Sequence, residues 1–401
     1  MISVEEARER ILAGLQPTAA EIVALADAWG RVTAAPVVAR LTQPPQDVSA
    51  MDGYALRAAD GTGGAMLKVI GTAPAGHPFD GAVGPGETVR IFTGSIIPEG
   101  TNAIVIQEDA TRDGEWVCIN EAAKPGRHIR RAGQDFAVGD TLLPEGRRMT
   151  ARDVGLAAAA NHPWITVHRR PRVAILATGD EIAMPGEPIP PGGIVSSNSH
   201  ALAALVRAAG GAPTILPVAR DTRDAVAAVA DSVAGMDLLV TTGGASVGDH
   251  DLVIEGLQTR GLQVDFWQIA MRPGKPLLFG RLGALPVLGL PGNPVSAMIC
   301  AILFLVPALA RLSGLPAMPP PTSTAVLGSP VGANDRRADH LRSTITRDNA
   351  GRIVATPFPV QDSAMLRRLA TADGLVLRPP HAPALPAGAE VPVILLNALS
   401  L

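Results

Sequence analysis

Hydrophobic and polar positions change their spacing along the chain. Ser3 with Glu6, and Thr18 with Glu21, have the spacing of capping boxes, and apolar residues recur at helical period after each pair. The first part of the chain is therefore predicted to form two helices, one after Ser3 and one after Thr18. Residues 33–150 carry short apolar runs such as LKVIGTA, TVRIFTG and NAIVIQE, separated by Gly, Pro and Asp. Such runs between turn residues predict a small β-rich unit.

From about Arg172 the chain alternates apolar strands with helices. The strands end in polar or Gly-rich turns, as in VAILATGDE, TILPVARD, DLLVTTGGASVGDHD and PVLGLPGNP. This alternation predicts a parallel sheet covered by helices on both faces, whose ligands bind at the carboxyl ends of the strands. After the proline-rich stretch 316–323 we expect a short β domain.

The stretch 282–310 is uncharged and raises the question of a membrane span. PGNP at 291–294 and Pro307 interrupt it, and the surviving helix of about 16 residues is shorter than the ~20 that a bilayer needs. We therefore expect a buried core helix and no membrane. The N-terminus, MISVEEARERILAGL, has three acidic residues and no signal-peptide pattern, so the expected location is cytoplasmic.

The composition excludes several classes of protein. With 47% hydrophobic and 18% charged residues the chain is that of a folded protein, and 401 residues at ~150 per domain predict two or three domains. A net charge of −3 lacks the basic face that nucleic-acid binding needs, so no nucleic-acid partner is expected. Cys118 and Cys300 show no CxxC spacing and predict neither a disulfide framework nor a zinc site.

Two catalogue motifs are absent from the sequence, GxxxxGK[ST] and GxGxxG, so a Walker-type NTPase and a Rossmann dehydrogenase lose support. Residues 244–248 read GASVG and match the nucleophile elbow of serine hydrolases. That chemistry needs a later Asp and His, whereas His340 and His381 lie beyond the proline-rich linker. We regard a serine nucleophile as the weaker interpretation.

TTGGASVGDHD is better interpreted as an anion cradle, because its glycines let backbone N–H groups approach a phosphate and Ser246 adds a hydroxyl. Asp249 and Asp251 follow at once, and carboxylates beside a phosphate are what Mg²⁺ requires. Two further strand ends carry the acids Asp180, Glu181 and Asp221. Any one of these acids is explained as a helix cap, but three acidic strand ends together favour a metal–phosphate site.

Positive charge is concentrated in MRPGKP, residues 271–276, where prolines flank Arg272 and Lys275. Only three of the 34 Lys and Arg residues are lysines, so Lys275 runs against the composition and indicates a compact point charge. A solvated surface loop is the alternative. PGNPVSA at 291–297 is explained as the start of a helix, and Asp52 before Gly53 as a hairpin tip.

Read in order, SAMDGYA, RIFTG, IRRAGQD, ATGDE, TTGGASVGDHD, MRPGKP and GLPGNPVSA resemble the molybdopterin molybdenumtransferases, the family that includes the C-terminal domain of gephyrin. The resemblance spans essentially the whole chain. It implies a transferase of molybdenum cofactor biosynthesis that inserts molybdenum from molybdate into adenylylated molybdopterin, uses Mg²⁺ and releases AMP. It also implies a homodimer that contacts the molybdopterin adenylyltransferase and the downstream molybdoenzyme machinery.

The fold implied by the resemblance is multidomain α/β plus β. It comprises a three-layer α/β/α molybdenum-cofactor-binding-like domain, a β-rich lid domain and a C-terminal β domain. The expected boundaries are a helical linking domain at 1–45 and 131–168, the lid at 46–130, the α/β domain at 169–317 and the β domain at 318–401.

Carried over by motif, the resemblance assigns roles to individual residues. The implied catalytic residues are Asp52, Thr93, Asp135, Glu181, Asp221 and Asp251, of which the last three are also the implied metal ligands. The implied substrate-binding residues are Arg130, Gly243, Gly244, Ser246, Arg272, Lys275, Pro291, Pro294, Arg342 and Ser363. Lys275, Arg342 and Ser363 form the implied molybdate pocket.

Four positions depart from the usual family pattern. Arg272 stands where a lysine is common, Gln134 where a glutamate is common, Val48 where an asparagine is common and Asp362 where a glycine is common. An acid at position 362 would repel molybdate.

The implied dimer predicts an active site shared between subunits, in which Asp52 and Thr93 of one chain face Glu181, Asp251 and Lys275 of the other. Two rivals are a non-catalytic molybdopterin-binding scaffold of the same fold and a competence-damage-type nucleotide hydrolase that resembles only residues 170–310. The acidic strand ends argue against the first rival, and the lid motifs argue against the second.

Overall fold

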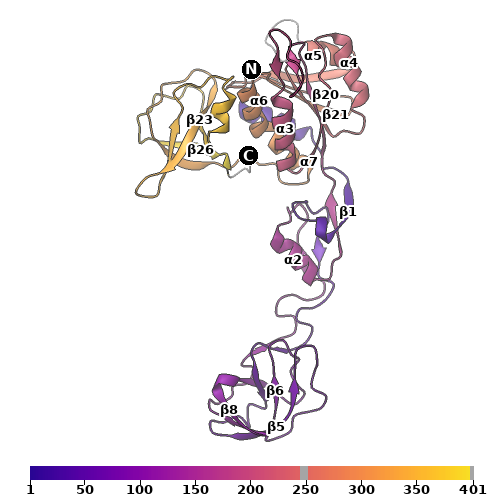
Figure 1. The fold of residues 1–401 in the computed structure, drawn as a ribbon, viewed down its shortest axis with the longest axis vertical. Helices are drawn as coiled ribbons and strands as arrows, with labels where there is room; N and C mark the ends of the chain where they lie inside the picture. The colour runs from indigo at the N-terminus through magenta and orange to yellow at the C-terminus, as the bar shows by residue number, and fades with distance from the viewer. Residues whose placement is uncertain (244–251, 398–401) are drawn as a thin grey trace.

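The structure is a computed structural model that describes residues 1–243 and 252–397. The chain is elongated (Figure 1). The α/β domain and the C-terminal domain lie side by side at one end, a small linking domain occupies the middle, and the β-rich lid lies at the far end.

The α/β domain is built on one six-stranded sheet of order β16-β13-β17-β21-β20-β18. In chain order the strands are β13 Arg172–Ala177, β16 Ala212–Ile215, β17 Leu238–Thr242, β18 Leu262–Gln268, β20 Pro276–Leu282 and β21 Leu285–Leu290. The first four in the sheet are parallel, β20 runs antiparallel to them, and the edge strand β18 pairs antiparallel with β20 and so runs in the same direction as the first four. The carboxyl ends of the parallel strands and the start of β20 therefore meet at the same edge.

Helices cover both faces of this sheet. The bounds are α1 Val4–Ala13, α3 Asn198–Ala208, α4 Arg223–Ser232, α5 Leu252–Gln258, α6 Pro294–Cys300, the π-helical turn η3 Ala301–Leu305 and α7 Val306–Leu312. Within β13, Val173 and Ile175 pack in the cluster under α1, α3, α6 and α7, whereas Ala174 and Leu176 pack under α4 and α5. Because alternate strand residues point to opposite faces, this is a three-layer α/β/α domain.

The run from α6 to α7 is the apolar segment noted in the sequence. Pro294–Leu312 is a 19-residue helix that is long and apolar enough to cross a membrane, but 78% of its apolar window is buried inside the protein. Phe304 and Leu305, near its middle, are fully buried in the α/β core. A buried core helix passes the same length and composition test, and its burial supports that interpretation.

In the linking domain the structure differs from two expectations. Residues after Thr18 form the strand β1 (Ala20–Ala24) and the 3₁₀ turn η1 (Leu25–Asp27) instead of a second helix. The Thr18 hydroxyl donates to the Arg169 carbonyl instead of capping a helix, and β1 pairs antiparallel with β12 (Trp164–His168). In addition, α1 packs into the α/β core through Val4, Ala7 and Ile11, so the first fifteen residues do not lie with the linking domain. The domain's other elements are β2 Val37–Val38, β11 Thr141–Leu143 and α2 Ala151–Ala159.

The lid is a six-stranded sheet of order β7-β4-β6-β5-β9-β8. Its elements are β4 Gly53–Leu56, β5 Met66–Ala73, β6 Glu87–Ile91, β7 Ala103–Ile106, the 3₁₀ turn η2 Gln107–Asp109, β8 Ala110–Asp113 and β9 Trp116–Ile119. At its base, β3 (Val48–Ser49) pairs with β10 (Ile129–Arg130). The expected β-rich unit is present.

The C-terminal domain is a closed β-structure, because β23 pairs with both β24 and β25 and so joins the two ends of the sheet. Its elements are β22 Ser323–Leu327, β23 Ala338–Arg347, β24 Ile353–Pro357, α8 Leu366–Ala370, β25 Gly374–Arg378 and β26 Glu390–Leu395. A short strand of the α/β domain, β19 (Met271–Arg272), pairs in parallel with the start of β23 and connects the two domains. The multidomain α/β plus β fold expected from the sequence is confirmed.

Candidate functional site

A cavity of about 790 Å³ opens at the carboxyl edge of the α/β sheet. It is bounded by the ends of β13, β17 and β21, by the start of β20 and by the first turns of α3 and α6. A short strand pair, β14 (Ile182–Ala183) with β15 (Ile194–Val195), forms one wall. Of the predicted site residues, those that line it are Glu181, Gly243, Lys275, Pro291 and Pro294.

The Gly-rich strand end at β17 needs its glycine. Gly243 has a φ of +93°, and a Cβ atom there would lie 2.6 Å from the Thr178 carbonyl oxygen at the end of β13. A side chain at this position would push the two strand ends apart. The predicted residues Gly244, Ser246 and Asp251 follow directly and lie outside the described residues.

Asn198, at the start of α3, holds the strand ends together. Its Nδ2 donates to Thr242 Oγ1 at 2.8 Å and to the Gly292 carbonyl at 2.7 Å. The ends of β17 and β21 are therefore fixed to one helix on the cavity wall. The sequence interpretation missed this residue, although an asparagine in SSNSH directly before an apolar helix was a signal for a polar contact there.

Three carboxylates gather beside the cavity. The Asp221 backbone N–H donates to Asp180 Oδ1 at 3.3 Å. The pKa of Asp221 is raised, first by burial and further by the negative charges of Glu181 and Asp180. Among the described residues no group of three His, Cys, Asp or Glu has the arrangement of a metal site. Carboxylate oxygens are the donors that Mg²⁺ prefers, and the third predicted ligand, Asp251, lies outside the described residues.

Lys275 supplies positive charge to the cavity. It lines the cavity, is half-buried and makes no hydrogen bond or ion pair through its side chain with any residue that the structure describes. The preceding Gly274 has a φ of +111°, and a Cβ atom there would lie 2.5 Å from Cys300 Sγ in α6. The loop that presents the ammonium group therefore packs closely on the core helix.

Arg272, from the same loop, does not reach this cavity. Its Nε and Nη2 donate to Asp339 Oδ1 and Oδ2 at 2.9 and 2.7 Å, and the Asp339 side chain is only 5% exposed. Arg272 instead lines a separate cleft of about 640 Å³ against the C-terminal domain. A buried carboxylate 67 residues away neutralises its charge, which the local motif could not reveal.

Arg342, also predicted to bind substrate, is not among the residues that line the cavity. It is fully buried on β23, its Nε donates to Gln361 Oε1 at 3.3 Å, and its Nη2 has no hydrogen-bond partner. Burial, and then the nearby Arg368, lower its pKa. Gln361, which the sequence interpretation missed, also accepts from the Arg342 backbone N–H and donates to its carbonyl.

The loop that follows Gln361 joins the C-terminal domain to the cavity rim. Ser363 Oγ accepts from Asn293 Nδ2 at 3.1 Å, and Ala364 and Leu366 line the cavity. Ser363 thus lies beside the rim. Asp362, the departure that would repel an anion, is exposed and accepts from the Ala364 backbone N–H.

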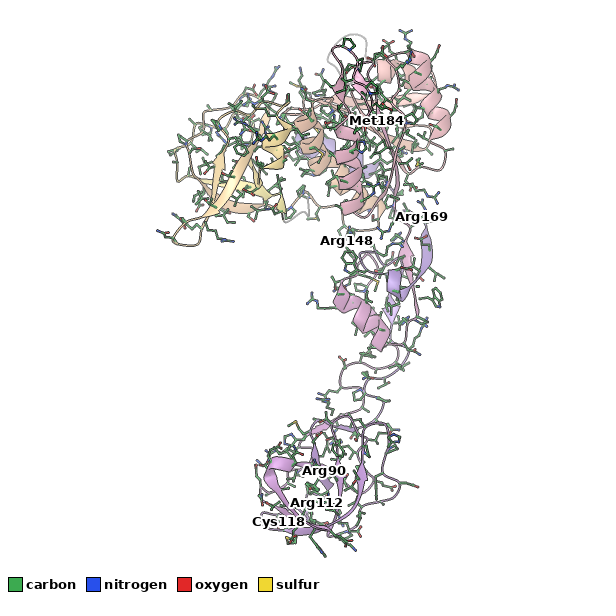
Figure 2. All side chains as sticks on the ribbon, in the orientation of Figure 1. Arg90, Arg112, Cys118, Arg148, Arg169 and Met184 are labelled. Carbon is green, nitrogen blue, oxygen red and sulfur yellow. The ribbon has the colours of Figure 1, made fainter. Side chains whose placement is uncertain are left out.

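Asp52 and Thr93 meet on the lid. Asp52 Oδ1 accepts from the Thr93 backbone N–H at 2.8 Å and from Thr93 Oγ1 at 2.9 Å, and these two bonds lower the Asp52 pKa. Arg90 adds positive charge beside the carboxylate; its guanidinium lies over the Tyr54 and Phe92 rings at 5.1 and 5.0 Å. Figure 2 places Arg90 on the lid.

Asp135 and Arg130 stay apart from both groups. Both are exposed; Arg130 lies in β10 at the base of the lid, and the Asp135 backbone N–H donates to the Gln43 carbonyl. Within one chain, moreover, the lid lies at the end of the molecule opposite the α/β domain (Figure 1). The structure therefore forms two groups of predicted site residues, one at the strand-end cavity and one on the lid.

Comparison with known proteins matches three parts of the chain to models of protein families. Residues 2–161 match the model of the MoeA N-terminal region (domain I and II), residues 174–311 that of a probable molybdopterin binding domain, and residues 324–396 that of the MoeA C-terminal region (domain IV). The chain is 38% identical to molybdopterin molybdenumtransferase 2 of Mycobacterium tuberculosis, over 98% of this chain and 99% of the relative.

More distant relatives give the same result. The molybdopterin molybdenumtransferase of Bacillus subtilis is 30% identical over 99% of this chain and 94% of its own. The crystal structure of a molybdopterin biosynthesis MoeA protein from Pyrococcus horikoshii is 31% identical, covers 98% of this chain and 99% of that chain, and has a TM-score of 0.86. The chain thus belongs to the molybdopterin molybdenumtransferase family, the enzymes of molybdenum cofactor biosynthesis that its ordered motifs indicated.

Proposed function

We propose that the protein inserts molybdenum from molybdate into adenylylated molybdopterin and releases AMP, in a Mg²⁺-dependent reaction. The observation that supports this proposal is the strand-end cavity of about 790 Å³, which is lined by Glu181 and by Lys275, a lysine that pairs with no residue the structure describes. Such a cavity suits a substrate with both a pyrophosphate and an organic ring, because acidic, basic and apolar walls surround it.

Molybdate is a dianion, and the proposal assigns it to the side of the cavity at Lys275, Arg342 and Ser363. The Lys275 ammonium group pairs with no residue that the structure describes, and the buried Nη2 of Arg342 has no partner among those residues either. A buried unpaired guanidinium N–H is costly, and an oxyanion at this position would satisfy it. Ser363, hydrogen-bonded to Asn293 at the rim, adds a hydroxyl.

Mg²⁺ is assigned to Glu181, Asp221 and Asp251. When bound, it neutralises charge on the pyrophosphate bridge that must break. A cation there would offset the repulsion by Glu181 and Asp180, which adds to the larger effect of burial in raising the Asp221 pKa. We infer that the dithiolene sulfurs of the substrate bind molybdenum, so that neither Cys118 nor Cys300 takes part.

We further propose that two chains share each site. Asp52, Thr93 and Arg90 lie at the end of the chain opposite the strand-end cavity, and a homodimer would let the lid of one chain cover the cavity of the other. Mixing Asp52→Asn with Glu181→Gln, each inactive alone, tests this. A shared site restores activity in verified heterodimers, to about half per heterodimer. Verified heterodimers without activity would place the site within one chain.

The decisive assay incubates the protein with adenylylated molybdopterin, molybdate and Mg²⁺, and measures AMP and active cofactor. Release of both supports the transferase. Binding of the substrate without AMP release would favour the non-catalytic scaffold. The proposed place in the pathway follows from the substrate: an adenylyltransferase for molybdopterin supplies it, and molybdoenzyme assembly consumes the product in the cytoplasm.

A further inference from the structure

A narrow cleft at the neck between the linking domain and the α/β domain collects positive charge. The neck cleft is lined by five basic side chains, Arg31, Arg148, His168, Arg169 and Arg170, and by no acidic residue among those the structure describes. Figure 2 places Arg148 and Arg169 at this junction, below the α/β domain. The strand-end cavity opens at the other edge of the sheet, because the chain enters β13 directly after Arg170.

Carboxylates outside the cleft neutralise two of these arginines. Arg169 makes a bidentate pair with Asp237, with both N–O distances at 2.8 Å. Arg31, only 8% exposed, pairs with Glu21 and donates to the His168 carbonyl. These two charges are therefore balanced without a ligand.

Arg148 and Arg170 have no such partner among the described residues. Arg148 Nη1 and Nη2 reach only the Gly30 and Ala209 carbonyls, at 3.4 and 3.3 Å, which is longer than an ordinary N–H···O bond. Arg170 is exposed, and no carboxylate of a described residue lies within ion-pair distance of it. Burial, and then the charge of Arg170, lower the Arg148 pKa, so the two guanidinium groups repel each other.

The backbone around Arg148 is shaped to admit its guanidinium. Gly210, just after the end of α3, has a φ of +92°, and a Cβ atom there would lie 3.2 Å from Arg148 Nη1. His168 is fixed as well, because its Nδ1 donates to the Thr18 carbonyl at 2.8 Å and leaves Nε2 as its other polar atom. The cleft is therefore preorganised, with two like charges facing each other across a domain boundary.

We propose that the neck cleft binds a tetrahedral oxyanion of charge −2, such as inorganic phosphate or the phosphate group of a phosphomonoester. A dianion matches the two uncompensated charges of Arg148 and Arg170, and the arginine fork matches its oxygens. The interior of the cleft has only about 10 Å³ of water-accessible space, room for about one water molecule, so the oxyanion would sit at its open mouth beside the exposed Arg170, with any attached group in solvent. The bound anion would join the linking domain, through Arg148, to the connection into the α/β domain, through Arg170.

Thermal unfolding tests the proposal with inorganic phosphate as the probe, compared with chloride at equal ionic strength. At a phosphate concentration ten times the dissociation constant, linkage between binding and folding predicts a rise in Tm of about 2 °C. The rise should persist in Arg112→Ala, a lid substitution on an exposed arginine, and disappear in Arg170→Ala. Arg170 is exposed and makes no ion pair with any described residue, so its removal leaves the fold intact.

A third variant separates this site from the proposed active site. Lys275→Ala should keep the response to phosphate, and calorimetric titration of that variant should give one phosphate per chain. A response that vanishes in Lys275→Ala and survives in Arg170→Ala would place the anion in the strand-end cavity and overturn the inference. So would a wild-type Tm that phosphate does not change.

Repeating the titration of Lys275→Ala with AMP identifies the source of the oxyanion. A rise in Tm and a stoichiometry equal to those with phosphate support a phosphomonoester. A response to phosphate alone supports the free ion. The inference stands independently of the proposed reaction, because its readouts are Tm and stoichiometry.

Discussion

Lys275 and Arg272 lie three residues apart in one loop, and the structure predicts that their removal has different effects. Lys275 lines the cavity and pairs with no described residue, whereas Arg272 is neutralised by Asp339. Lys275→Ala should therefore weaken molybdate binding. A charge-assisted contact contributes about 1.5–3 kcal/mol. Since 1.4 kcal/mol is a factor of ten, the molybdate concentration for half-maximal activity should rise at least ~10-fold.

Arg272→Ala should act mainly on stability. The pair is bidentate and Asp339 is buried, but the Arg272 side chain is 48% exposed, so solvent screens the interaction. A fully buried pair that loses one partner costs about 3–5 kcal/mol. An exposed pair contributes at most ~1 kcal/mol, so about 1–3 kcal/mol is expected here.

The assay is AMP release against molybdate concentration, with the midpoint of urea unfolding measured on the same preparations. Lys275→Arg is the matched control, because it keeps the charge, and it should retain most of the molybdate affinity. An Arg272→Ala variant that is as stable as the wild type and needs as much extra molybdate as Lys275→Ala would refute the assignment of the two charges.

Three further predictions follow from the site. Asp221→Asn should raise the Mg²⁺ concentration needed for AMP release, because it removes a carboxylate from the acidic strand ends; an unchanged Mg²⁺ titration would contradict its role. Gln361→Glu should raise the molybdate requirement several-fold by neutralising Arg342, whereas an effect on kcat alone would point to another cause. Thr93→Val should raise the Asp52 pKa, measured by NMR, towards its ordinary value. Only part of the shift should be lost, because the backbone N–H bond of Thr93, the larger cause, remains.

The pH dependence of the Asp52–Thr93 contact has a definite sign. The folded-state pKa of Asp52 lies below its ordinary value of 3.8. The contact therefore stabilises the lid fully above the unfolded-state pKa, and the stabilisation is lost as the pH falls through the lowered folded-state value. Neutral pH leaves it intact.

Sequence patterns alone predict the α/β domain and the sheet edge at which its candidate site lies. A parallel sheet brings the carboxyl ends of its strands to one edge, so the acids of ATGDE and VARD, the glycine after β17 and the PGNP turn were bound to meet there. Local rules also gave the short strands of the lid and the helix at Ser3, whose hydroxyl does cap α1. These features depend on periodicity and on neighbours a few residues away, which a sequence displays directly.

The tertiary structure decided what depends on partners far apart in the chain. Thr18 and Glu21 have capping-box spacing, but pairing with β12 about 145 residues later made that segment a strand, because cross-strand hydrogen bonds outweigh weak helix propensity. Asp339 forms an ion pair with Arg272, which does not line the cavity, and Gln361 accepts a hydrogen bond from the buried Arg342. The elongated arrangement, finally, separated Asp52 and Thr93 from the cavity. No local pattern encodes these contacts, since each arises only when domains pack and charges far apart in sequence become neighbours.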